Sequence, residues 1–198
     1  LANGRRCVVS KKELVANREC GECNLCCISL LIDCPELTKL PGIACENLKK
    51  SGGCSIYTKR PPTCQDWYCQ WRYIPQLGDQ WRPDLKGIML SNMLEGVPEE
   101  YSHKEAFDFK ILKDTSIIND QDFINVLAAF IEQGYACFIS TGKPGHASTK
   151  IFLNDYLMPA VSTKNIDLFK SELLTAIEEC INHPKEKMAI KDGKIIRL

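Results

Sequence analysis

Apolar residues in the second half of the chain recur with the spacing of amphipathic helices. Over residues 122–133 they stand at offsets of 0, 3, 4, 7 and 8, which predicts a helix with one apolar face. Asn119 or Asp120 can cap the start of this helix, and Gly134 follows its end. Similar spacing predicts a second helix over residues 166–181, which Pro184 prevents from continuing.

Strands are predicted before, between and after these helices. Residues 86–91 and 149–153 are short runs rich in apolar side chains, and residues 107–111 alternate with a period of two. Residues 135–140 are largely apolar and precede the turn signal of residues 142–145, so they predict a buried strand. That turn contains Lys143 but lacks the spacing of a phosphate-binding loop. Asp192-Gly193 predicts a hairpin over residues 188–198.

The first half of the chain lacks such periodicity. Residues 1–19 are mostly polar and basic, and we interpret them as an N-terminal arm. Prolines and glycines are scattered through residues 20–73, so loops and short helical turns are expected there. A segment of this kind buries too little apolar area to fold by itself, and metal coordination could supply the missing free energy.

Cysteines crowd into this same segment. The chain has 12 cysteines among 198 residues, and nine of them lie between residues 20 and 69. Such crowding indicates either disulfides or metal ligands. Disulfides dominate in small secreted domains without a core, whereas residues 76–198 have an ordinary pattern of helices and strands. A metal site is therefore favoured, with a disulfide framework as the alternative.

The spacing of the cysteines is typical of iron-sulfur and zinc ligands. A run with two residues between successive cysteines lets one loop wrap three corners of a cubane, while a fourth thiolate arrives from a remote position. Neighbouring side chains diverge by about 100° on a helix, so Cys26 and Cys27 are not expected to serve one tetrahedral ion. The predicted metal ligands, which could form two sets of four, are Cys20, Cys23, Cys26, Cys27, Cys45, Cys54, Cys64 and Cys69.

The literal string CGECNLCC at residues 20–27 resembles the signature of the CxxCxxCC family of zinc- or iron-chelating proteins. The resemblance extends through CENL at residues 45–48, GCSIY at 53–57, RP at 60–61, Cys64 and Cys69. It covers residues 20–73 and implies chelation of iron or zinc. A relative in the wider group is the flagellin lysine N-methylase, which implies cluster-assisted methyl transfer, although this chain has no dinucleotide-type glycine loop.

Arg60 and Tyr57 are the candidate cofactor-binding residues. Arg60 precedes two prolines and could place its guanidinium group against cluster sulfur, because thiolate sites carry excess negative charge. Tyr57 could belong to an aromatic wall that keeps the metal dry. The alternatives are a loop arginine beside a rigid turn and simple aromatic packing.

The remaining thiols have no predicted role as ligands. Cys137 and Cys180 lie in apolar patterns and are expected to be buried small residues. Cys34 lies outside the family pattern, and Cys7 lies in the arm. The three histidines are scattered without partner spacing, so solvated positions are expected for them.

Charge and hydropathy restrict the expected partners. The 25 basic and 25 acidic residues balance, so no long-range field favours nucleic acid or an anionic membrane. No segment approaches the roughly 20 apolar residues of a membrane span, and no secretory apolar core stands near the start. We therefore expect a cytoplasmic protein whose partners are metal ions, with a protein partner left open.

These patterns predict an α+β fold. Residues 20–75 would form a cysteine-rich, loop-dominated metal-binding module packed on a small sheet with two amphipathic helices, which residues 76–198 supply. An iron-sulfur cluster is favoured over Zn²⁺, because the first cysteines are closely spaced and no histidine accompanies them. The functions left open are redox or cluster-assisted chemistry, a zinc-stabilised interaction module without catalysis, and protein lysine methylation.

Overall fold

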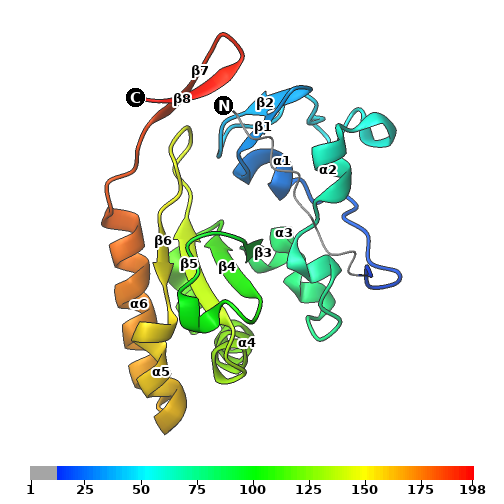
Figure 1. Ribbon diagram of the computed structural model, residues 1–198. Helices are drawn as coiled ribbons and strands as arrows, with labels where there is room; N and C mark the ends of the chain where they lie inside the picture. The colour runs from blue at the N-terminus through cyan, green and yellow to red at the C-terminus, as the bar shows by residue number, and fades with distance from the viewer. Residues whose placement is uncertain (1–12) are drawn as a thin grey trace.

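A four-stranded mixed sheet forms the centre of the computed structural model, which describes residues 13–198 (Figure 1). The strand order is β3 (Ile88–Met93), β4 (Ala106–Ile111), β5 (Ala136–Thr141) and β6 (Lys150–Phe152). Strands β4 and β5 run parallel, whereas both outer strands are antiparallel to their neighbours. The protein is therefore an α+β fold, as the sequence predicts.

Three helices cover one face of the sheet: α4 (Gln121–Glu132), α5 (Asn154–Thr163) and α6 (Ile166–Asn182). Helix α4 connects β4 to β5, which makes the parallel pairing possible. The Asp120 carboxylate caps it by accepting a hydrogen bond of 3.0 Å from the Phe123 amide. The main core lies between this layer and the sheet, and its fully buried members include Phe109, Phe123, Leu127, Ile139, Leu157, Leu173 and Ile177.

The cysteine-rich segment lies beside the sheet on the side away from α5 and α6 (Figure 1). It contains only short elements, because its prolines and glycines interrupt longer ones. These elements are helices α1 (Leu25–Ser29) and α2 (Pro62–Asp66), strands β1 (Ile32–Cys34) and β2 (Leu37–Lys39), and the 3-10 helices Tyr57–Lys59 and Gln70–Arg72. The 3-10 helix Asp79–Trp81 and helix α3 (Pro83–Lys86) follow the segment and precede β3. Further 3-10 helices span Glu99–Tyr101 and Thr115–Asn119, and a C-terminal hairpin pairs β7 (Met188–Lys191) with β8 (Lys194–Arg197).

Most predicted elements are confirmed within about two residues, including both amphipathic helices, the four sheet strands and the hairpin at Asp192-Gly193. The prediction of two helices on the sheet was wrong, because α5 is a third. Pro159 lies inside α5 and interrupts the pattern that would have revealed it. This helix contacts both α4 and α6, so it completes the helical layer.

Part of the predicted N-terminal arm, including Cys7, lies outside the described residues. From residue 13 onward the chain follows residues 71–77. The Arg18 guanidinium group donates hydrogen bonds to the carbonyls of Trp71, Ile74 and Leu77, and the Val15 amide donates to the Arg72 carbonyl at 2.8 Å. These bonds attach the residues preceding Cys20 to the segment that follows Cys69.

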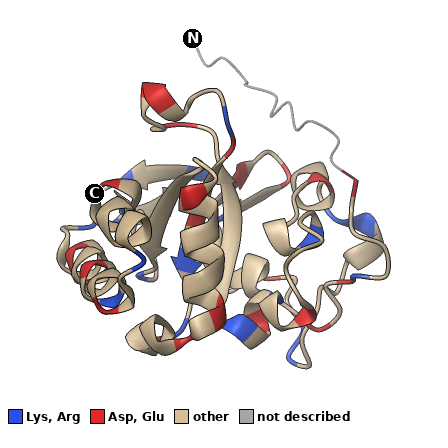
Figure 2. Ribbon diagram, turned by 90° about the horizontal axis from the view of Figure 1, so that it is seen from below, with Lys and Arg blue, Asp and Glu red and all other residues tan. Residues whose placement is uncertain are grey.

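Acidic and basic residues are interspersed along the ribbon rather than gathered at one end (Figure 2). This distribution agrees with the net charge of zero. Within the described residues, no helix has the length and apolar character needed to cross a membrane.

Gly42 packs tightly against Pro144, so it joins the cysteine-rich segment to the loop after β5. Its φ is +73°, and a Cβ there would lie 2.7 Å from the Pro144 Cα atom. We expect Gly42→Ala to lower the free energy of unfolding by roughly 2 to 4 kcal/mol, from backbone strain plus the clash. Gly53 has a φ of +75° but open space around it, so Gly53→Ala should cost roughly 1 kcal/mol. Urea unfolding measures both, and equal losses would contradict this packing.

Candidate metal centre

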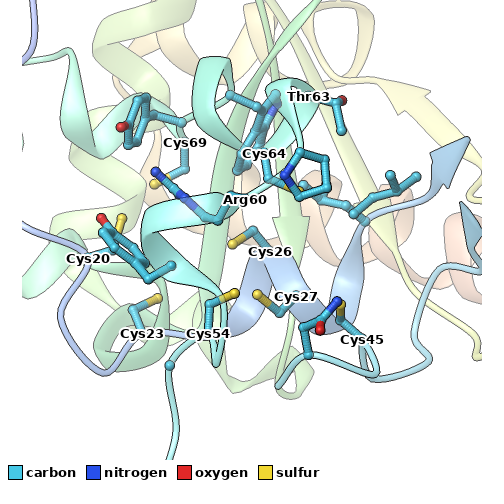
Figure 3. Close-up of a pocket in the computed structure, with 18 of the residues that line it drawn as sticks. Cys20, Cys23, Cys26, Cys27, Cys45, Cys54, Arg60, Thr63, Cys64 and Cys69 are labelled. Atoms are coloured by element: carbon cyan, nitrogen blue, oxygen red, sulfur yellow. The ribbon is translucent and has the colours of Figure 1, made fainter. Parts of the chain in front are cut away.

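All eight cysteines predicted as metal ligands line one cavity of about 220 Å³ (Figure 3). Tyr57 and Arg60 line it as well. The cysteines of residues 13–198 are free thiols, so the disulfide framework is absent from the described chain. The structure thus brings the ten predicted site residues to a single place, although they span 50 positions from Cys20 to Cys69.

Short turns position the first thiols. The Cys23 amide donates a hydrogen bond of 2.9 Å to the Cys20 carbonyl, and Gly21 between them adopts a φ of +53°. Helix α1 then carries Cys26 and Cys27, with no residue between them. One loop and one helical turn therefore deliver four sulfur atoms.

Backbone hydrogen bonds bring the later thiols back to the same cavity. The Cys45 amide donates to the Cys27 carbonyl at 2.9 Å, and Cys54 forms an isolated antiparallel bridge with Leu48. Cys64 lies in α2, which begins at Pro62 with the preorganised φ of proline. Cys69 is buried and precedes the 3-10 helix Gln70–Arg72.

The thiols fall into two groups by their mutual electrostatic effects. Burial, together with the neighbouring Cys20 and Cys23, raises the pKa of Cys69 to about 12. Burial also raises the pKa of Cys64, to which Cys27 and Cys45 contribute. Figure 3 agrees, since Cys20, Cys23 and Cys69 lie toward one end of the cavity and Cys45 toward the other.

Cys26 and Cys27 lie where the two groups meet. The Cys26 thiol donates a hydrogen bond to Cys27, and this bond, together with the charges of Lys39 and Arg60, lowers the pKa of Cys27 to about 6 despite burial. The pKa of Cys26 rises because of the same hydrogen bond, burial and the charges of neighbouring cysteines, including Cys20. Cys27 is thus easier to ionise than the neighbouring Cys26.

Lys39 and Lys110 hold α1 from its carboxyl end. The Lys39 side chain is buried, and its ammonium group donates hydrogen bonds of 2.7 to 2.9 Å to the carbonyls of Ile28, Leu40 and Ile43. The Lys110 ammonium group donates to the Ser29 carbonyl at 3.1 Å. Burial lowers the pKa of Lys39, whereas thiolates at Cys45 and Cys27 raise it. Both cations therefore satisfy carbonyls at the end of α1, and Lys39 also offsets charge on the cavity thiols.

Two arginines near the cavity stack their guanidinium groups on tyrosine rings. The Arg60 guanidinium carbon lies 4.2 Å from the centre of the Tyr57 ring, and the Arg60 Nε atom is buried without a hydrogen-bond partner in the described chain. Arg72 stacks on Tyr68 at 5.0 Å, and its Nη1 atom lies 3.9 Å from the Cys20 sulfur. Arg60 and Tyr57 thus form one unit at the cavity, as their predicted roles require.

Some neighbouring residues were missed by sequence reasoning. Lys39, Arg72 and Met89, which is buried and lines the cavity from β3, are spread over 51 positions and carry no local signal. Only the fold brings them to the thiols.

The other cysteines of residues 13–198 lie away from the cavity lining. Cys34 donates to the Leu37 carbonyl at 3.3 Å, although it is near enough to raise the pKa of Cys64. Cys137 and Cys180 are 0% exposed, which confirms their prediction as buried residues. The histidines do not line the cavity either.

No group of three or more His, Cys, Asp and Glu side chains within residues 13–198 has the arrangement that a metal ion requires. The donor set itself fits an iron-sulfur cluster or zinc, since it consists of sulfur atoms around one space. Each Sγ is a single bond from its Cβ, so rotation about χ1 moves it without moving the backbone. What the described residues lack is a close enough approach of the sulfur atoms to one another to hold a metal ion.

Comparison with known proteins adds no name to this arrangement. No family model matches the chain. No curated protein matches it, and no solved structure does. The resemblance of residues 20–73 to the CxxCxxCC family stays a prediction from the sequence.

Proposed function

We propose that this chain is a metal-binding protein whose thiolates hold an iron-sulfur cluster in the cavity of residues 20–69. The observation that carries the proposal is the convergence of eight free cysteines on one space of about 220 Å³. Free thiols at this density have little other structural use, because they bury weakly polar groups without crosslinking the chain.

The surrounding residues have roles in this proposal. Lys39 and Arg60 offset negative charge, which thiolates and bridging sulfides would otherwise accumulate in a poorly solvated space. Met89 and Leu30 supply apolar walls that exclude water. Bound there, a cluster would supply one-electron transfer or assist group chemistry.

A second candidate is a zinc-stabilised module without catalysis. The division of the thiols into two groups favours it, because two all-thiolate zinc ions need four ligands each and leave no open position. Cys20, Cys23, Cys26 and Cys69 would form one set, and Cys27, Cys45 and Cys64 would form most of the other. Lysine methylation is supported by the family resemblance alone.

One preparation separates these candidates. The full chain is purified without oxygen, and its iron, acid-labile sulfide and zinc are quantified together with its visible spectrum. The iron-sulfur proposal expects a brown protein with iron and sulfide in equal amounts. A colourless protein with stoichiometric zinc would replace it by the second candidate, and a protein with neither metal would refute both.

A further inference from the structure

A second cavity, of about 480 Å³, lies at the carboxyl ends of the two parallel strands. Residues 110–115, at and after the end of β4, and residues 141–144, at and after the end of β5, line it. Ligands of open α/β sheets bind outside the carboxyl ends of parallel strands, because the connecting loops diverge there. The cavity thus occupies the position where this topology places small-molecule sites.

The lining is strongly basic. Lys110, Lys113, Lys143 and Lys185 line the cavity, with Asp114 as the single acidic residue of the lining. None of the four lysines forms an ion pair with a carboxylate of the described chain. A concave surface with an excess of charge of one sign concentrates ions of the opposite sign.

The hydrogen bonds of these lysines use neutral acceptors. The Lys110 ammonium group donates to the Ser29 carbonyl and the Ser148 hydroxyl, and Lys185 donates to the carbonyls of Cys180 and Ile181. Burial lowers the pKa of Lys110, although Asp108 raises it. An anion in the cavity would stabilise charges that these acceptors solvate only in part.

The walls of the cavity are fixed. Gly42 packs against Pro144 so closely that a Cβ would clash, and the Gly145 amide donates a hydrogen bond of 2.8 Å to the Pro41 carbonyl. These contacts join the cysteine-rich segment to the loop after β5. A preformed wall spares a ligand the entropy cost of ordering loops.

The cavity also has an apolar side, formed by Ile28, Ile111, Leu112, Ile177 and Ile181. We propose that it binds a small phosphomonoester whose organic part is apolar. Lysine ammonium groups bind phosphate oxygens as point charges, and several of them around one space suit the two negative charges of a phosphomonoester better than the single charge of a carboxylate. This inference does not rest on the metal, because the thiol cavity lies on other residues of α1.

Calorimetric titration of the full chain, as purified, with phenyl phosphate tests the proposal, with benzoate and phenol as comparison ligands. We expect saturable binding of phenyl phosphate, at least tenfold weaker binding of benzoate, and none of phenol. Saturation absent at millimolar phenyl phosphate would overturn the proposal. Equal binding of benzoate, or comparable binding of phenol, would also overturn it.

A matched pair of double variants locates the site. Lys113→Gln/Lys143→Gln removes two exposed lysines of the cavity, and Lys191→Gln/Lys194→Gln removes two exposed lysines of the C-terminal hairpin. Lys110 is retained because it anchors α1. The cavity variant should bind phenyl phosphate at least tenfold more weakly, and the hairpin variant should bind like the parent chain. Unchanged metal content and circular dichroism exclude misfolding, and equal affinity of the two variants would contradict this location.

Discussion

Removal of the proposed metal should unfold residues 20–73 while the sheet and its helices stay folded. The helices and strands of this segment are three to five residues long, so they cannot persist without outside support. Its buried contributions to the main core are confined to Cys69 and Trp71. In small zinc modules the metal supplies roughly 10 to 16 kcal/mol of apparent folding free energy, which is the scale of the support expected here.

Hydrogen exchange read out by mass spectrometry measures this effect peptide by peptide. After treatment with a chelator, amides of residues 20–73 should exchange at least about a thousandfold faster, which corresponds to about 4 kcal/mol. Peptides from β4, α4, β5 and α6 serve as the internal control, because Cys69 is the one cavity thiol among the buried members of their core. Protection that survives complete loss of metal would show that packing alone folds the segment.

Replacing one thiol from each group should abolish metal binding at that group. Where the replaced thiol, Cys23 or Cys64, is a ligand, we expect the change to Ser to weaken retention of metal at that site by more than about 100-fold, since even indirect partners of a ligand contribute up to that factor. Elemental analysis by inductively coupled plasma mass spectrometry measures the metal bound per chain after desalting. A single cluster predicts that one of the two variants loses all the metal, whereas two zinc sites predict loss of about half in each.

Two cysteines outside the cavity lining provide matched controls. Cys180→Ala removes a buried thiol whose sulfur contacts the carbonyls of Ile139 and Thr149, far from the cavity lining. Cys34→Ala removes a thiol near Cys64 that does not line the cavity. Both variants should keep the full metal content. Equal losses in these controls and in Cys23→Ser would mean that the cavity thiols have no special role.

The helices and strands after residue 86 could be predicted because each carries its own periodic signal. Helix α4 is the clearest case, with an apolar face, an aspartate cap and Gly134 at φ +78° after it. Helix α5 was missed, because Pro159 interrupts its pattern and its buried face depends on α4 and α6. The parallel pairing of β4 with β5 is a long-range property with no local signal.

The candidate site was predictable in its members but not in its arrangement. Crowded cysteines in a segment without a core of its own predict one shared metal site. For this reason Cys20 and Cys69 could be assigned to the same site although 48 residues separate them. Their grouping depends on how loops fold back, as when the Cys45 amide meets the Cys27 carbonyl. Lys110 reaches Ser29 across 81 positions, so no sequence pattern could have assigned it to α1.

The two lysines at the end of α1 make the cysteine-rich segment dependent on the rest of the chain. Lys39 belongs to the segment itself, but Lys110 belongs to the central sheet. A fragment excised at residue 75 would keep every cavity thiol and still lose one of the cations that orient Cys26 and Cys27. The cysteine-rich segment and the sheet are therefore structurally dependent on each other. A substitution of Lys110 on β4 can change the position of the Cys26 and Cys27 sulfur atoms although Lys110 contacts neither of them.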